Sequence, residues 1–434
     1  MRSPLFLRSA HHHKARITPT VPDVPHTGGS PDRPLRVIIG CDTFAPDVNG
    51  AAKFAERLAA GLVERGHEVH VVGPRPESGP NITRAEMHEG QMMTVHRLRS
   101  WRWRPHPWVR YTLPWRIEKN AARILDAVKP DVVHFQSHIV VGRGLARQAV
   151  KRGIRVIGTN HFMPENGMHF TPFVGALREP AVRAVWKAAG RTFGLAEAVT
   201  TPTRKAADYL ERYAGLTEVH PISCGLHIDN YTPNFAPRTE NVVLFLGRLE
   251  AEKHVDELLR AVKTLDPALD VAVEIIGDGE LKPALERLAV QLGISHRVHF
   301  SGHAPESYLK EQLTRATVFA MPSRAELQSI ATMEAMASGL PIVGARAMAL
   351  PHLIHDGDNG FLYEPGDVTQ FAALLTRVFT MPHDTLLELK RESLRIVGGH
   401  DINRTLDTFE ALYRGETVID PVVDGDDVSA AVAS

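Results

Sequence analysis

The stretch from Arg36 to Val72 reads RVIIGCDTFAPDVNGAAKFAERLAAGLVERGHEVHVV, and it decides the fold class. It opens with a β-branched apolar run, residues 36–40, that is typical of a buried strand. Residues 51–65 then carry apolar side chains at helical spacing, a glycine ends the helix, and residues 68–72 form a second apolar run. This order predicts a strand–helix–strand unit with parallel strands.

The same alternation continues along the chain and then restarts after a segment of linker composition, residues 231–239. Before the linker, we expect strands at 131–135, 155–159 and 197–201, with helices at 142–151 and 203–213. After it, we expect strands at 242–247, 272–277, 298–301, 318–321 and 341–343, with helices at 255–265, 281–292 and 330–338. Short apolar runs separated by helices predict parallel sheets that are covered on both faces.

The predicted class is therefore α/β, with two facing, Rossmann-like, doubly wound domains and a ligand cleft between them at the carboxyl ends of the strands. We place one domain at residues 35–234, a second domain at 235–400 and a cross-over helix at 401–414, and the family resemblance described below implies that the first binds the acceptor and the second the nucleotide sugar. Residues 1–34 and the acidic residues 415–434 lack apolar periodicity and are expected to be disordered tails.

Composition excludes several classes of protein. The 434 residues suffice for two domains, and 50 Lys plus Arg against 50 Asp plus Glu give zero net charge, so no global field favours nucleic acid. No apolar run approaches the roughly 20 residues of a spanning helix. Two cysteines without ligand-like spacing fit a reducing compartment, and we expect a cytoplasmic location.

Three loops at predicted strand ends carry side chains suited to an anionic sugar donor. Gly50 opens the first helix, where backbone N–H groups can approach a phosphate, although a glycine there is more often structural. Arg248 and Lys253 follow a buried strand and can contact a diphosphate, with a solvated charged loop as the alternative. Glu326 and Glu334 border one helix N-terminus, and these two carboxylates can accept hydrogen bonds from sugar hydroxyls.

With these motifs, and with Gly277-Asp278-Gly279 and residues 335–341 (AMASGLP), the chain resembles the retaining, two-domain glycosyltransferases of family 4, which have the GT-B fold. The resemblance covers about residues 35–414 and is greatest to the branch that glycosylates diacylglycerol. It implies that Arg248 and Lys253 hold the donor diphosphate, that Glu326 binds a donor-sugar hydroxyl and that Glu334 binds the ribose. The same resemblance adds Gly50, Gly277, Ser329 and Ile330 to the donor-binding set and implies no metal or other cofactor.

Histidines at predicted strand ends are further candidates for the site. The family often has a His-x-His pair, but the run here is His134-Phe135-Gln136, so the second histidine is missing. His134 and His161 remain hypotheses for catalytic residues near the transferred sugar, against a purely structural role.

Two basic stretches suggest contact with an anionic membrane. Residues 97–116 contain six arginines, four tryptophans and no acidic residue, a composition suited to a lipid headgroup layer. Residues 178–191 combine basic and apolar side chains in a predicted interfacial helix. A solvated charged face above packed aromatics is the alternative, and nucleic-acid binding fits less well.

The sequence thus predicts a retaining hexosyltransferase on the inner face of the cytoplasmic membrane, using UDP-glucose or UDP-glucuronic acid and a lipid such as diacylglycerol. GDP-mannose transfer to a phosphoinositide or glycolipid, and transfer to a soluble acceptor, are alternatives. A nucleotide-sugar sensor without turnover is the alternative from another class.

Overall fold

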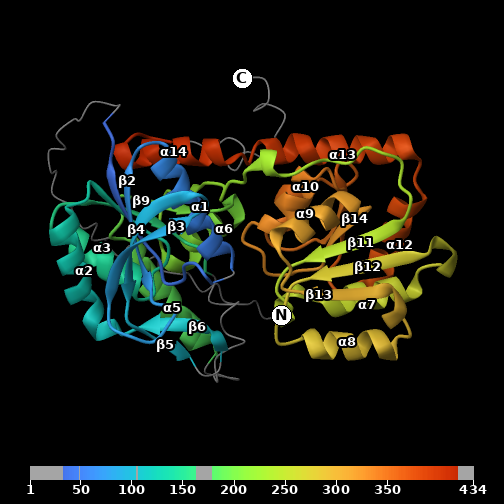
Figure 1. Cartoon of the computed structure of the whole chain (residues 1–434), viewed down its shortest axis with the longest axis horizontal. Coiled ribbons are helices and arrows are strands. Elements are labelled where there is room, and N and C mark those ends of the chain that lie inside the picture. The colour runs from blue at the N-terminus through green and yellow to red at the C-terminus, as the bar shows by residue number, and fades with distance from the viewer. Residues whose placement is uncertain (1–32, 48, 104–105, 163–177, 419–434) are drawn as a thin grey trace, which may run out of the picture. The chain divides into compact units, whose positions relative to one another are not determined.

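The computed structural model describes residues 33–47, 49–103, 106–162 and 178–418 (Figure 1). The predicted disordered tails lie almost wholly outside these residues. Every element below belongs to the compact unit that begins at Pro34.

The first half is built on an eight-stranded sheet in the order β10-β9-β8-β7-β1-β2-β4-β3. All neighbours pair in parallel except β3 and β4, which are antiparallel. Its strands are β1 (Arg36–Gly40), β2 (Glu68–Pro74), β3 (Ile82–His88), β4 (Gln91–Leu98), β7 (Val132–Phe135), β8 (Arg155–Thr159), β9 (Ala198–Thr201) and β10 (His220–Pro221). Its helices are α1 (Gly50–Glu64), α2 (Pro114–Val128), α3 (Val141–Val150), α5 (Arg178–Phe193), α6 (Arg204–Tyr209) and the π-helical turn η3 (Leu210–Ala214).

The central strands are apolar because helices cover both faces of the sheet. Every residue of β7 and β9 is buried, which is typical of parallel strands in a doubly wound sheet. Asn49 caps α1 by accepting a hydrogen bond from the Ala52 N–H at 2.9 Å. This cap fixes the first turn of α1 directly after the loop that follows β1.

Residues 82–112 form strands that the sequence did not lead us to expect. β3 and β4 make a hairpin at one edge of the sheet, and β5 (Ser100–Trp103) pairs with β6 (His106–Thr112) in a separate two-stranded sheet. Most of β3 is exposed, so its alternation of side chains carries no apolar signal.

The second half contains a fully parallel, six-stranded sheet in the order β13-β12-β11-β14-β15-β16. Its strands are β11 (Asn241–Leu246), β12 (Val271–Ile276), β13 (Val298–Gly302), β14 (Val318–Met321), β15 (Ile342–Ala345) and β16 (Gly360–Tyr363). Its helices are α7 (Val255–Thr264), α8 (Lys282–Gln291), α9 (Glu306–Arg315), α10 (Ile330–Ala337), α11 (Leu350–Leu353), α12 (Val368–Thr380) and α13 (His383–Gly398). Figure 1 shows α7 and α8 on one side of β11 to β13, and α9 and α10 on the other.

The last helix, α14 (Ile402–Arg414), returns to the first half. Its apolar residues Ile402, Leu406, Phe409 and Leu412 belong to the core formed by β1, β2 and α1. No helix within the described ranges is long and apolar enough to span a membrane.

The two parallel α/β sheets confirm the predicted fold class. The exact domain limits remain a prediction.

Candidate functional site

Backbone contacts pack together the loops that follow β11, β12 and β13. Gly247 N–H donates to Ile276 O at 3.0 Å, and Gly277 N–H donates to Gly302 O at 2.9 Å. A β-carbon at Gly277 would lie 1.9 Å from Gly247 O, and the φ of Gly277 is +138°, so no other residue fits there. Gly277 therefore allows the close approach of these loops and brings Arg248 and Lys253 to one end of the sheet.

Lys253 and Glu326 form a buried ion pair between the loop after β11 and the loop after β14. The Lys253 ammonium donates to Glu326 Oε1, and the two side chains are 14% and 11% exposed. Burial alone would raise the pKa of Glu326, but the charge and hydrogen bond of Lys253 outweigh it and hold this pKa below its ordinary value. Glu326 is therefore ionised at neutral pH.

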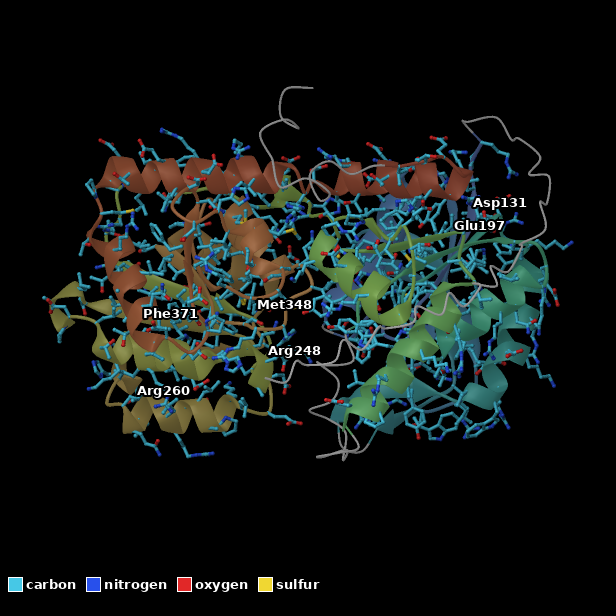
Figure 2. All side chains as sticks on the ribbon, turned by 180° about the vertical axis from the view of Figure 1, so that it is seen from behind. Asp131, Glu197, Arg248, Arg260, Met348 and Phe371 are labelled. Carbon is cyan, nitrogen blue, oxygen red and sulfur yellow. The ribbon has the colours of Figure 1, made fainter. Side chains whose placement is uncertain are left out.

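Arg248 remains half-exposed beside this pair. Its guanidinium donates to Glu252 Oε1 at 3.2 Å, and its side chain is 50% exposed. Figure 2 shows Arg248 well apart from Arg260 of α7. An exposed Arg–Glu pair four residues apart is weak, so Arg248 is available to an incoming anion.

Glu334 lies on α10 and has a partner that the sequence did not reveal. The Tyr231 hydroxyl, in the segment between the two sheets, donates to Glu334 Oε1 at 3.0 Å. Burial raises the pKa of Glu334, while the nearby Arg57 and the hydrogen bond from Tyr231 oppose that rise. Within the described part of the chain, no side chain or backbone group hydrogen-bonds the second carboxylate oxygen, which can therefore accept from a ligand hydroxyl.

The start of α10 has an unusual backbone. Ser329 adopts a left-handed conformation with φ +71°, which is uncommon for a non-glycine residue, and its hydroxyl lies 2.8 Å from Thr332 Oγ1. A β-carbon built at Gly50 would lie 3.8 Å from Ile330 Cδ1. The first residues of α1 and α10 therefore lie close together, as the donor-binding prediction for Gly50, Ser329 and Ile330 requires.

His134 is enclosed in the core of the first half. It is fully buried, its Nδ1 lies 2.7 Å from the Tyr413 hydroxyl, and its Nε2 lies 2.6 Å from Thr159 Oγ1. Burial, with His161 nearby, lowers its pKa to about 3, so the ring is neutral. These contacts contradict the catalytic role predicted for His134, because no atom of the ring is accessible to a substrate.

His161 follows the carboxyl end of β8 and is only partly buried. Its Nε2 lies 2.8 Å from Gln136 Oε1, and burial lowers its pKa to about 3. Because the Gln136 oxygen can only accept, Nε2 carries the proton and Nδ1 has the lone pair. Gln136 thus orients His161 from the position where the family often has a histidine, and the catalytic role of His161 stays a prediction.

The basic stretch 97–116 is divided between the interior and the surface. Arg97 is buried and bonded to both carboxylate oxygens of Glu86, which contradicts the prediction that it contacts a membrane. Exposed side chains from this stretch are those of Arg99, Arg102, Tyr111, Trp115 and Arg116, which we call the basic-aromatic surface. Trp103, Arg104 and Trp108 belong to the predicted patch, but their side chains lie outside the described part of the chain.

Helix α5 also differs from its prediction. Trp186 and Phe193, expected to insert into an interface, are buried in the core of the first half. Arg183, Lys187 and Arg191 are exposed at intervals of four residues and form one basic row. Thus α5 offers charge, but not the apolar face of an interfacial helix.

The arrangement suits an anionic, hydroxyl-rich ligand. Several groups lie around the carboxyl ends of the strands of the second sheet. They are the cations Arg248 and Lys253, the carboxylates Glu326 and Glu334, and the backbone N–H groups at the starts of α1 and α10. Among the residues that the structure describes, no cluster of three or more His, Cys, Asp or Glu side chains could hold a metal ion.

This fold and these loops are typical of glycosyltransferases of the GT-B class. Two family models match adjacent parts of the chain, Glycosyltransferase Family 4 over residues 48–230 and Glycosyl transferases group 1 over residues 230–394. The protein belongs to glycosyltransferase family 4.

Named relatives and a solved structure agree with this assignment. A GDP-mannose-dependent alpha-mannosyltransferase of Mycobacterium tuberculosis is 28% identical over 77% of this chain and 85% of its own length. A GDP-mannose-dependent alpha-(1-6)-phosphatidylinositol dimannoside mannosyltransferase of the same species is 25% identical over 75% of this chain and 83% of its own length. The structure of Anabaena Alr3699/HepE with UDP-glucose is similar in fold, with a TM-score of 0.67 and 17% identity, over 88% of this chain and 100% of that one.

Proposed function

We propose that this glycosyltransferase moves a hexosyl group from a nucleotide sugar to a membrane lipid, with retention of configuration at the anomeric carbon. The observation that carries the donor half of the proposal is the ion pair of Lys253 and Glu326 beside the start of α10. In this pair a cation suited to a diphosphate lies next to a carboxylate suited to sugar hydroxyls, which supports the proposal.

The donor diphosphate binds near Arg248 and Lys253, whose charges stabilise the negative charge that grows on the leaving group. Lys253 then shares its protons between Glu326 and the phosphates. Glu326 accepts a hydrogen bond from a hydroxyl of the transferred sugar, and Glu334 accepts one from the ribose with the oxygen that Tyr231 leaves free. The residues provide charge neutralisation themselves, so the proposal includes no metal.

Two donors compete. The sequence favoured UDP-glucose or UDP-glucuronic acid, whereas the names of the two mycobacterial relatives favour GDP-mannose. The name of one relative includes a phosphatidylinositol lipid, which supports a lipid acceptor for this chain. A mannosyl transfer to such a lipid is therefore the second candidate function.

The donor and acceptor are tested together by mass spectrometry. Purified protein is incubated with a lipid extract and, separately, with UDP-glucose, UDP-glucuronic acid and GDP-mannose. A lipid product that gains one hexosyl or uronosyl mass with one donor supports the proposal and identifies that donor. Transfer only to soluble acceptors contradicts the lipid half, and nucleotide binding without transfer or hydrolysis supports the sensor alternative.

Membrane contact is proposed through the basic-aromatic surface, where Trp115 is 73% exposed and Arg99 stacks on Trp101 at 4.8 Å. Aromatic rings and cations together suit an anionic headgroup layer.

The test is flotation with vesicles of phosphatidylcholine with and without phosphatidylglycerol. We expect Trp115→Ser with Arg102→Ser to reduce flotation on anionic vesicles. The matched control is Val290→Ser with Arg260→Ser, which changes one exposed apolar residue and one arginine in the second half. Equal flotation of both double variants would remove the basic-aromatic surface from the proposal.

A further inference from the structure

Three separate segments of the chain meet around the buried side chain of Gln328. This residue lies in the loop between β14 and α10, two positions after Glu326, and is 3% exposed. Its Oε1 accepts from the Cys224 N–H at 2.8 Å, and its Nε2 donates to Ser223 Oγ at 2.8 Å. His400 Nδ1 lies 2.9 Å from the same Ser223 Oγ and 3.5 Å from Gln328 Nε2.

Two of these segments are the connections between the halves. Residues 222–227 lead from β10 to the second half, and residues 399–401 lead from α13 back to α14. Leu226 N–H donates to His400 O at 2.9 Å, and Ile402 N–H donates to Leu226 O at 3.0 Å. Hydrogen bonds therefore join the two connections to each other. The side chain of Gln328 joins both to the loop between β14 and α10, which we call the donor loop.

A second contact holds the same loop from the first half. The Thr203 hydroxyl, at the start of α6, donates to Leu327 O at 3.0 Å. Leu327 and Gln328 lie between Glu326 and Ser329, the residue with the left-handed backbone. The position of Glu326 and the start of α10 thus depends on contacts made by neither the sugar nor the phosphates.

We propose that Gln328 is a positioning residue, whose hydrogen bonds hold the donor loop in a fixed position relative to the two connections between the halves. The inference rests on the proposed donor role of Glu326 and the start of α10. Gln328 does not touch the donor; it acts through the backbone of its neighbours. Loss of its hydrogen bonds lowers the turnover of bound donor more than it weakens the binding of the nucleotide.

Glutamine suits this position because the site needs one acceptor and one donor. Cys224 N–H requires an acceptor, whereas Ser223 Oγ accepts from the amide nitrogen of Gln328. Burial, with a smaller effect of the nearby His352, lowers the pKa of His400 to about 3, so its ring is neutral. A carboxylate in place of the amide would have no proton to donate to Ser223 Oγ.

The test compares Gln328→Met and Gln328→Glu with wild type in kcat, KM for the sugar donor and Kd for the nucleoside diphosphate, from pH 6 to 8.5. We expect Gln328→Met to lower kcat about a hundredfold, the effect of a displacement near 1 Å, while the nucleotide Kd changes by less than about threefold. For Gln328→Glu we expect kcat to recover as the pH falls, because a proton on the new carboxyl restores the missing donor.

Gln312 is the matched control, because it is also buried in the second half and contacts neither connection. Gln312→Met and Gln312→Glu should keep the pH profile of wild type. If Gln328→Met does not fold, Ser223→Ala replaces it, because this variant removes one partner of Gln328. Ser223→Ala should also lower kcat more than it changes the nucleotide Kd, but to a smaller extent.

Equal loss of kcat and nucleotide affinity, or a wild-type pH profile in Gln328→Glu, would overturn the inference. Wild type itself tests the underlying function separately. If wild type binds no nucleotide and transfers no sugar, the proposed donor site fails. If wild type is active and the Gln328 variants match it, only the positioning role fails.

Discussion

Replacing Lys253 by Met should leave the Glu326 carboxylate buried without its cation. The two side chains are only 14% and 11% exposed, so solvent screens their attraction weakly. Breaking a buried pair by removing one partner costs about 3 kcal/mol or more, and we expect the free energy of unfolding to fall by about 3 kcal/mol at pH 7. Met preserves most of the apolar stem, so lost packing contributes little.

The loss of unfolding free energy in Lys253→Met should decrease as the pH falls. In wild type the pKa of Glu326 is held below its ordinary value, so its ionisation contributes stability above the unfolded pKa, and this contribution is lost as the pH falls through the folded pKa. Without Lys253, burial raises the pKa of Glu326 above its unfolded value. The deficit of Lys253→Met is then greatest at neutral pH and shrinks toward about pH 4, where the carboxyl becomes protonated.

Urea unfolding followed by far-ultraviolet circular dichroism at pH 7 and pH 5 measures this difference. Lys263→Met is the control, because Lys263 is exposed on α7. The double variant Lys253→Met with Glu326→Gln should regain most of the stability, since no unpaired charge remains. A deficit below about 1 kcal/mol, the range of exposed pairs, or one that does not change with pH, would refute the reasoning.

Three further predictions concern the same regions. Arg248→Ala should lower kcat about a hundredfold or more without changing the melting temperature, because the half-exposed guanidinium stabilises the leaving diphosphate rather than the fold; steady-state kinetics with unchanged turnover would exclude it from the mechanism. Tyr231→Phe should further raise the pKa of Glu334 and weaken nucleotide binding by about tenfold at most, the value of one hydrogen bond, as measured by calorimetry. Burial lowers the pKa of His134 and His161 to about 3, so the folded protein binds fewer protons than the unfolded chain, and the melting temperature should fall as the pH drops below about 6.5; a melting temperature constant from pH 7.5 to 5 would contradict this.

The parallel core could be predicted because its signal is local. A strand buried on both faces is a short apolar run, and the run expected at residues 242–247 corresponds to β11, Asn241–Leu246. The edge strands lack this signal. β3 reads ITRAEMH and is mostly exposed. The burial of Arg97 becomes evident only once β4 is known to pair with β3, which brings Arg97 to Glu86.

The location of a candidate site residue could be predicted where that residue follows the end of a strand. Arg248, Lys253 and Glu326 follow strand ends, and the topology alone brings such residues to one edge of a sheet. Tyr231 and Gln328 could not be found in this way, because their partners lie about a hundred residues away and no local pattern marks them. The catalytic role predicted for His134 has the opposite difficulty. His134 lies near a strand end, but its side chain is directed into the core.

The position of α14 has a consequence for biosynthesis. The core of the first half is completed by Ile402, Leu406 and Phe409, which are synthesised after the entire second half. We therefore expect a nascent chain that ends before residue 402 to leave part of the apolar core along β1 and α1 uncovered. Residues 35–234 expressed alone should be less soluble than the same segment with α14 supplied as a separate peptide or by fusion.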